Sequence, residues 1–458
     1  MTVESREGMS ESDTIAALAS PPGEGAISLI RISGPEAIYV ADKIFLGHAA
    51  PHEMRSGHQR FGGIWDQGKK IDEVMLVVHR APRSYTGEHV VEISCHGGVL
   101  ITGKVLQTVL RHGARMARPG EFTERAFLNG KMDLTQAEAV MDLIRAQSEL
   151  AMRSAQEQLS GRLGHQVMEL RDRVLGVLAH VEAYIDFPEE DIDPETGDAL
   201  VGRMVDVEKQ IQKLLDTAET GRILREGVRT VLAGAPNAGK SSLLNAMVGF
   251  DRAIVSEIPG TTRDTIEEWV HFHGLALRLI DTAGLRETED VVEAEGVHRT
   301  RKMLGMADVV LHVVDASQPK PAGFTRETAE HAFLILNKSD IGTHPDWQDD
   351  IGKEGVVPVS CVTGEGIDRM GTLMAEAVGM ASLGNDGGVT AINTRHRMCL
   401  EKALQAMQKA VESMRAQESP EFVAIFIRET LDFVGEVVGK TDTEDLLGEI
   451  FSTFCLGK

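Results

Sequence analysis

Short apolar runs alternate with polar turns through the first 129 residues of the chain. Apolar residues cluster at 26–32, 74–78 and 90–93, each about the length of a strand, and residues 99–112 carry apolar side chains at helical spacing. This alternation of strand-like and helix-like segments predicts an α+β domain over residues 1–129.

A long helical pattern follows, and it is interrupted once by a different kind of sequence. From 134 to 215 apolar residues recur three and four positions apart, with an acidic loop at 188–196, and the same pattern resumes from 394 to 454. The interruption carries strand-like runs at 228–233 and 333–336. We therefore expect a multidomain α/β protein in which a helical domain (130–224 and 385–458) is split by an inserted doubly wound module (225–384). The glycine-containing segments 221–227 and 379–388 are the expected hinges.

A phosphate-binding loop opens the inserted module. Residues 234–241 read Gly-Ala-Pro-Asn-Ala-Gly-Lys-Ser, between a predicted strand and a predicted helix. Gly234 and Gly239 allow backbone N–H groups to turn toward phosphates at the helix N-terminus, Lys240 supplies a positive charge, and the Ser241 hydroxyl is suited to Mg²⁺. The strand, loop and helix together predict a nucleotide site, with Ala238 and Ser242 completing the loop.

The base specificity follows from residues 337–340, Asn-Lys-Ser-Asp, at the end of the predicted strand 333–336. The Asp340 carboxylate can accept two hydrogen bonds from guanine, whereas adenine would leave it unpaired. Asn337 and Lys338 belong to the same motif, and Ser360 lies in a short segment, 358–361, of the kind that closes such sites. With Thr261, Thr262 and the run Asp281, Thr282, Ala283, Gly284, these residues predict a Ras-like GTPase.

The catalytic residue is not the usual one. In Ras-like GTPases a Gln after the Asp-x-x-Gly motif orients the attacking water, but Leu285 stands there in this chain. An acidic run from 287 to 295 offers replacements. The carbonyl oxygen of Asn237, with backbone oxygens of residues 256–261, is suited to a monovalent cation that would stand in for an arginine finger. The alternative is that Asn237, a common turn residue, only shapes the loop.

Further motifs lie outside the nucleotide module. They are Asp-Thr-Ile-Ala-Ala at 13–17, Pro-Pro-Gly-Glu-Gly at 21–25, Arg-Ile-Ser-Gly at 31–34, Ser-Tyr-Thr-Gly-Glu at 84–88, Pro-Gly-Glu-Phe-Thr at 119–123, Arg-Ala-Phe-Leu-Asn-Gly-Lys at 125–131, Gln-Ala-Glu-Ala at 136–139 and Cys-Leu-Gly-Lys at 455–458. Together with the GTPase motifs, they make the chain resemble the tRNA-modification GTPase family MnmE, also called TrmE, over nearly its whole length.

The resemblance implies an enzyme that hydrolyses GTP during tRNA modification. With an FAD-dependent MnmG-type partner, such enzymes add an aminomethyl or carboxymethylaminomethyl group to the wobble uridine of certain tRNAs. The one-carbon unit comes from a tetrahydrofolate derivative, 5-formyl- or methylene-tetrahydrofolate. The resemblance further implies a homodimer whose GTPase modules associate in a potassium-dependent manner. The N-terminal domain would then bind tetrahydrofolate and dimerise.

Site residues carry over at matched positions. Glu293 is the implied water-positioning residue, and Ser241 with Thr262 are the implied Mg²⁺ ligands. The implied K⁺ ligands are Asn237, Ser256, Ile258 and Thr261. The folate residues are Arg31, Glu88, Lys131 and Lys458. Without the resemblance, each of these four would be read as an ordinary surface or salt-bridge residue.

Cys455 stands fourth from the end of the sequence, but the two residues that follow Leu456 do not fit a prenylation signal. Its position beside Lys458, within the terminal motif of the resemblance, makes it a candidate catalytic nucleophile. The alternative is a small side chain that is simply buried.

Composition and charge narrow the setting. The 458 residues are 42% hydrophobic, enough for about three domains, and the four widely spaced cysteines suggest no disulfide framework. Without a transmembrane-length run or a signal pattern, we expect a cytoplasmic protein. The net charge is −23, and residues 1–130 hold 14 Lys and Arg against 15 Asp and Glu. So acidic a chain repels nucleic acid, so the partner is expected to supply much of the tRNA-binding surface.

Two other classes share some of these features. A regulatory GTPase switch in ribosome assembly has the same nucleotide motifs, but it normally adds a basic RNA-binding module, and no such module is evident in this sequence. A GTPase chaperone for metal insertion would need His and Cys clusters with ligand spacing, which we do not find.

Overall fold

The computed structural model describes residues 13–186, 197–250, 268–280, 307–322, 331–380, 391–440 and 444–458, together with residues 305 and 324. The chain forms two compact units. One contains the residues up to Met141 together with Val438–Lys458, and the other contains Asp142–Val437. The predicted acidic loop at 188–196 lies outside the described residues.

The first unit is built on a mixed seven-stranded sheet of order β3-β4-β5-β6-β2-β1-β7. Only β1 and β7 pair in parallel. Ile30, Ile32, Leu76 and Ile93 are fully buried beneath α1 and α2, so the sheet buries one alternating apolar face, as its sequence pattern requires. The elements are β1 (Ile15–Leu18), β2 (Ile27–Ser33), α1 (Ala37–Ile44), β3 (Phe45–Gly47), β4 (Gln59–Asp66), β5 (Lys69–His79), β6 (Val90–His96), α2 (Val99–Arg111) and β7 (Arg115–Met116).

The end of the chain completes this unit. Helices α3 (Glu121–Leu128), α4 (Leu134–Arg145) and α14 (Glu444–Ser452) precede the terminal turn. Gly457 has a φ of 87°, and a Cβ there would lie 2.4 Å from the backbone oxygen of Leu18. Only glycine allows the last turn to lie this close to β1. The terminal residues therefore pack beside the strand that follows the first motif of the sequence.

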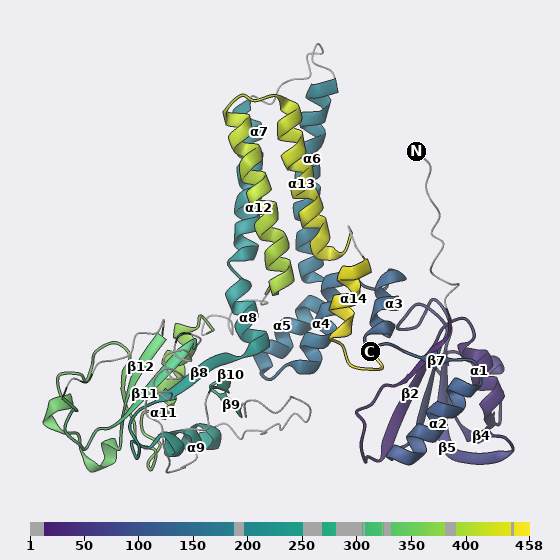
Figure 1. Ribbon diagram of the computed structural model, residues 1–458, viewed down its shortest axis with the longest axis horizontal. Coiled ribbons are helices and arrows are strands. Elements are labelled where there is room, and N and C mark those ends of the chain that lie inside the picture. Colours follow the sequence, from purple (N-terminus) through teal and green to yellow (C-terminus); the bar gives the residue numbers. More distant parts are fainter. Residues whose placement is uncertain are drawn as a thin grey trace. The chain divides into compact units, whose positions relative to one another are not determined.

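The second unit contains long helices and a second sheet (Figure 1). Helices α6, α7 and α12 pack on one another along their lengths, burying apolar residues such as Val174, Met204 and Met407. The Asn393 side chain begins α12 by accepting a hydrogen bond from the backbone of His396, which is a standard N-cap. The helices are α5 (Glu149–Leu159), α6 (Arg162–Asp186), α7 (Gly197–Leu215), α8 (Ala218–Glu226), α12 (Thr394–Arg415) and α13 (Pro420–Val438).

The second sheet has the order β13-β12-β11-β8-β10-β9, and every pair is parallel except β10 with β9. The chain leaves β8 for β10 on one side and reaches β11 on the other, which places a topological switch point at the carboxyl end of β8. The described elements are β8 (Val228–Ala233), α9 (Lys240–Phe250), β9 (Glu268–Phe272), β10 (Leu275–Leu279), β11 (Val309–Asp315), β12 (His331–Asn337), β13 (Val356–Pro358) and α11 (Ile367–Ala377).

The predicted fold class is confirmed, but one predicted hinge is wrong. Residues 221–226 belong to helix α8, and only Gly227, with a φ of 73°, leaves the helix. Gly221 is a packing glycine, because a Cβ there would lie 2.3 Å from the backbone oxygen of Ile392. Most of the second predicted hinge, residues 381–388 of 379–388, lies outside the described residues.

No helix among the described residues is long and apolar enough to cross a membrane. Within the same residues, no group of three or more His, Cys, Asp or Glu side chains is arranged to hold a metal ion.

The packing of Gly221 makes a testable prediction. Gly221→Ala should lower the free energy of unfolding by about 1–3 kcal/mol, because the new methyl group meets a backbone atom that cannot rotate away. Gly202→Ala in α7 is the matched control, since a Cβ there meets nothing within 4 Å; it should be neutral or stabilising by about 0.5–1 kcal/mol. Urea unfolding followed by circular dichroism measures both, and equal stability of the two variants would contradict the packing role.

Candidate functional site

The phosphate loop joins β8 to α9 and depends on two glycines. Gly234 has a φ of 144° and Gly239 a φ of 96°, and a Cβ at Gly234 would lie 2.1 Å from the backbone oxygen of Val313. Asn237, between them, also has a positive φ of 64°, a conformation that Asn tolerates better than most residues. The loop therefore curves around an open space at the N-terminus of α9, where backbone N–H groups favour anions.

Lys240 is held inside this curve. Its Nζ donates hydrogen bonds to the backbone oxygens of Gly234 at 2.7 Å and Ala235 at 3.0 Å. Burial lowers the pKa of the Lys240 ammonium. An anion placed in the loop would offset that burial cost. Ser241 and Ser242 follow in the first turn of α9 and are exposed.

The guanine motif is attached directly to the phosphate loop. The buried Asn337 side chain at the end of β12 donates a hydrogen bond to the backbone oxygen of Ala238 at 3.0 Å. A Cβ on Gly239 would lie 2.1 Å from the same Asn337 amide nitrogen. Glycine at 239 is therefore required both by its own φ and by its contact with Asn337. The two predicted motifs meet at this point.

Lys338 and Asp340 follow in a tight turn. Lys338 has a φ of 64°, and its Nζ lies 2.6 Å from the carboxylate of Asp315, the last residue of β11. Burial raises the pKa of Asp315, but hydrogen bonds from Lys338 and Ser317 outweigh it, so the net pKa is lowered. Asp340 is exposed in this turn, so its carboxylate is accessible to an incoming base.

The segment after β13 closes the same corner. Ser360 is fully buried, and its Oγ accepts hydrogen bonds from the backbone N–H groups of Val362 and Thr363. The Cys361 thiol donates to the Asn337 side-chain oxygen at 3.2 Å. Burial raises the pKa of the Cys361 thiol, which keeps it protonated as the donor. Cys361 therefore helps to orient Asn337, a role that Ala at this position could not have.

The structure brings together ten of the predicted nucleotide-site residues or their backbone neighbours, but it does not describe the rest. The predicted residues that lie outside the described part of the chain are Ser256, Ile258, Thr261, Thr262, Asp281, Thr282, Ala283, Gly284 and Glu293.

A second cluster of predicted residues lies in the first unit. Arg31 on β2 pairs with Glu92 on β6 at 2.8 Å and donates to the backbone oxygen of Gly457 at 3.4 Å. Its guanidinium also lies over the rings of Tyr85 and Phe122, at 5.3 and 5.7 Å from their centroids. Arg31 therefore ties the sheet to the terminal turn of the chain.

Glu88 is fully engaged by neighbours. Ser33 Oγ donates to one Glu88 oxygen at 2.7 Å, and Arg125 lies 3.2 Å from both oxygens. Arg125, only 9% exposed, also binds Asp13 and Glu121. Sequence reasoning did not identify Arg125 as part of the site, although it begins the quoted motif at 125–131. It holds Glu88 in place.

A cavity of about 380 Å³ lies beside these residues. Lys131 lines it and donates to the backbone oxygen of Pro82 at 3.1 Å. Glu92 lines the cavity, and Glu88 is not among the lining residues. The remaining lining residues are His79, Arg83, Ser84, Tyr85 and Val90. Of these, Ser84 and Tyr85 lie in a motif that the sequence singled out, whereas Glu92 and Arg83 carried no signal.

The terminal residues complete the cluster. Burial lowers the pKa of the Lys458 ammonium, and the nearby Arg31 lowers it further. The backbone oxygen of Lys458 accepts a hydrogen bond from Phe122 at 3.2 Å. Cys455 is exposed, so the alternative that it is simply a buried side chain is wrong. The geometry brings Arg31 and Lys458 together as two cations near one carboxylate, Glu92.

Two family models match the chain. The "GTP-binding protein TrmE N-terminus" model matches residues 14–131, and the "MnmE helical domain" model matches residues 134–455.

Curated relatives match along nearly the whole chain. A tRNA modification GTPase MnmE of Akkermansia muciniphila is 50% identical over 97% of this chain and 99% of its own length. That of Alkaliphilus oremlandii is 43% identical with the same coverage. Among solved structures, the G domain of the T. maritima FeoB iron transporter is 29% identical and covers 33% of this chain and 98% of its own, with a TM-score of 0.25. A TM-score this low does not by itself establish a common fold.

The position of Asp340 makes a prediction about base choice. Asp340→Asn should weaken GTP binding by about 10²-fold or more, because the amide cannot accept both guanine hydrogen bonds. The same variant should gain affinity for xanthosine triphosphate, whose carbonyl accepts a hydrogen bond from an amide. Equilibrium titration with fluorescent nucleotides measures both. Asp346→Asn, at a nearby exposed carboxylate, is the matched control, and GTP binding that Asp340→Asn leaves unchanged would refute the role.

Proposed function

The chain belongs to the MnmE family of tRNA modification GTPases, and on that premise we propose that it hydrolyses GTP during modification of the wobble uridine of certain tRNAs. The product would carry an aminomethyl or carboxymethylaminomethyl group. The single observation that carries the proposal is the full-length similarity, 50% over 97% of the chain. The joined phosphate and guanine motifs at Asn337 and Ala238 supply a nucleotide site for it.

The alternative is a regulatory switch in ribosome assembly. That class would share the nucleotide module, but the match of residues 14–131 to the TrmE N-terminus favours the tRNA-modification function.

We propose that the nucleotide site works with two metal ions. Ser241 and Thr262 would hold Mg²⁺, and Asn237, Ser256, Ile258 and Thr261 would hold K⁺. Bound K⁺ would supply positive charge beside the phosphates where an arginine finger supplies it elsewhere. Glu293 would orient the attacking water in place of the Gln that Leu285 replaces. The open curve of the loop and the exposed Asn237 fit this arrangement.

We propose that the cavity in the first unit binds a tetrahydrofolate derivative, 5-formyl- or methylene-tetrahydrofolate. Arg31, Lys131 and Lys458 would bind its glutamate carboxylates. The cavity volume of about 380 Å³ and the aromatic side chain of Tyr85 suit a flat pterin ring. Glu88, held by Arg125, would contribute through the loop that it anchors, and Glu92 offers a carboxylate within the cavity itself. Cys455, exposed in the terminal turn beside Lys458, is the proposed nucleophile.

The remaining expectations stand as proposals. The protein would act in the cytoplasm as a homodimer with an FAD-dependent MnmG-type partner, and tRNA would bind largely through that partner because this chain is so acidic. The proposed domains are 1–129 (folate binding and dimerisation), 130–224 and 385–458 (helical), and 225–384 (GTPase).

The proposed function is tested by the modified nucleosides of tRNA. Cells lacking this chain should lose the aminomethyl-type wobble uridine, as measured by mass spectrometry, and the wild type should restore it. Lys240→Ala should not restore it, because the loop loses its cation. Lys353→Ala, at an exposed lysine of the same module, is the matched control and should restore it. An unchanged nucleoside profile in the deletion strain would favour the ribosome-assembly switch.

Potassium dependence separates the two roles considered for Asn237. GTP turnover should be about tenfold or more faster in potassium than in sodium at equal ionic strength, within the 10³–10⁵ that an arginine finger contributes. Asn237→Gly keeps the positive φ and removes the side-chain oxygen, so it should abolish the difference. If the glycine variant keeps its potassium stimulation, Asn237 only shapes the loop.

The lowered pKa of Lys458 predicts a pH dependence of folate binding. Folate carboxylates bind the protonated ammonium, so affinity should be highest below the pKa of Lys458. It should fall as pH rises through that pKa, which lies below the ordinary lysine value of about 10.4. Lys458→Arg should keep its affinity at high pH, because guanidinium stays charged. Calorimetric titration with 5-formyl-tetrahydrofolate measures this. The control is Lys69→Arg at an exposed lysine of β5, and identical profiles for both variants would exclude Lys458.

A further inference from the structure

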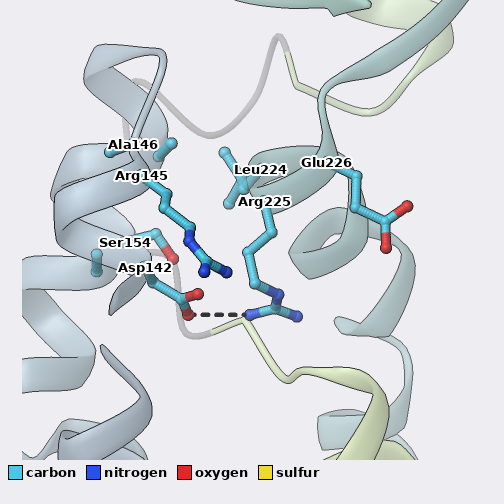
Figure 2. A pocket seen from close by; sticks show the side chains of 9 residues that line it. Asp142, Arg145, Ala146, Ser154, Leu224, Arg225 and Glu226 are labelled. Carbon is cyan, nitrogen blue, oxygen red and sulfur yellow. Dashed lines mark ion pairs between the residues drawn. The ribbon is translucent and has the colours of Figure 1, made fainter. Parts of the chain in front are cut away.

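A second cavity, of about 240 Å³, lies in the second unit and takes no part in the proposed chemistry. It is bounded by the end of α4, the middle of α5 and the end of α8. Figure 2 shows the side chains around it. The lining residues are Asp142, Arg145, Ala146, Ala151, Ser154, Ala155, Leu224, Arg225 and Glu226.

Two guanidinium groups dominate the polar lining. Arg145, the last residue of α4, and Arg225, near the end of α8, extend toward the same space from different helices (Figure 2). The Glu226 carboxylate points away from that space in the same view. The charge facing the cavity is therefore two arginines against the single carboxylate of Asp142. Like charges converge here without equal compensation, which favours an anionic ligand.

The compensation by Asp142 is loose. Its carboxylate lies 3.5 Å from Arg225, beyond ordinary hydrogen-bond distance. Arg225 also donates a hydrogen bond to the backbone oxygen of Ile392, which fixes its guanidinium in place. An anion that approached Arg225 closely would therefore compete with a weak partner and would not need to reposition the arginine.

The rest of the lining leaves room for such a ligand. Ala151 and Ala155, one turn apart on α5, place only methyl groups at the wall, and Leu224 supplies an apolar side. Ser154 lies between the two alanines and brings a buried hydroxyl to the cavity. Small side chains around paired guanidinium groups form a compact site for a ligand the size of phosphate.

We propose that this cavity is a binding site for a small oxyanion, either free phosphate or a phosphate-bearing metabolite. Arg145 and Arg225 bind its oxygens from opposite sides, Ser154 adds a hydroxyl, and Asp142 competes with the ligand for Arg225.

The cavity is also close in sequence to the nucleotide site. Arg225 is two residues before β8, the strand that leads into the phosphate loop. Helix α8 is tied to the sheet by Arg222, which pairs with Asp308 at 2.8 Å, and Asp308 pairs in turn with Arg229 on β8 at 2.8 Å. An oxyanion bridging α4 and α8 would thus connect the helices to the strand that bears the loop.

Equilibrium dialysis with radiolabelled inorganic phosphate tests the proposal. The full-length protein is first saturated with Mg²⁺ and a non-hydrolysable GTP analogue, so that the phosphate loop is filled. Arg145→Gln should weaken phosphate binding about tenfold or more, since it removes a charged donor. Asp142→Asn should strengthen binding about threefold or more, since it removes the competitor. Arg153→Gln is the matched control, because Arg153 lies on α5 outside the cavity lining with a 61% exposed side chain.

The two variants have opposite expected signs, so a general loss of structure cannot reproduce the pattern. Any other anion site is common to all three variants and cancels in the comparison. Equal affinities of Arg145→Gln and Arg153→Gln would overturn the proposal, and so would weaker binding by Asp142→Asn. Competition by glycerol phosphate compared with sulfate distinguishes a phosphate-bearing metabolite from free phosphate. Neither outcome of this experiment depends on tRNA modification or on folate binding.

Discussion

The close approach of Asn337 to Gly239 is the contact on which the nucleotide site depends. The Asn337 amide can reach the backbone oxygen of Ala238 only because position 239 has no Cβ. This single contact fixes the distance between the loop that holds phosphates and the turn that carries Asp340. A nucleotide has a rigid distance between its phosphates and its base, so the two halves of its site must be held at one spacing. Cys361 strengthens the same contact from the other side.

A second constraint decides how the nucleotide module is attached to the helices. Gly221 lets α8 lie directly on the backbone of Ile392, and the pairs of Asp308 with Arg222 and Arg229 bind α8 to the sheet. Burial raises the pKa of Asp308, but the hydrogen bonds from Arg229 and Arg222 outweigh it, and the net pKa is lowered. The carboxylate therefore remains charged and paired. The chain enters the module through a packed helix that turns at Gly227, and flexibility at this entry is confined to a much shorter segment than the glycine spacing suggested.

The sequence predicted those features that depend on neighbouring residues. The loop at 234–241, the strand 228–233 and the motif at 337–340 are local patterns, and the structure places them as expected. The role of Gly221 was misread because a glycine that packs against a distant backbone looks the same in sequence as a glycine in a hinge. Glu92 and Arg125 were missed for a related reason: their roles depend on β2, β6 and α3 meeting in space, and no spacing along the chain encodes that meeting.

The two carboxylates of the first unit show how tertiary contacts redistribute a predicted role. Glu88 accepts from Ser33 and faces Arg125 with both oxygens, so its capacity is already used within the protein. Glu92 is paired only through Arg31 among its printed contacts and faces the cavity. A ligand that carries both a donor edge and carboxylates would find its acidic partner in Glu92 and its cations in Arg31 and Lys458. The cost of burying Lys458 next to Arg31 is offset only when an anion arrives. The terminal turn is thus prepared electrostatically for a ligand, and Glu88 serves that turn by keeping Arg125 and the loop at 84–88 in place.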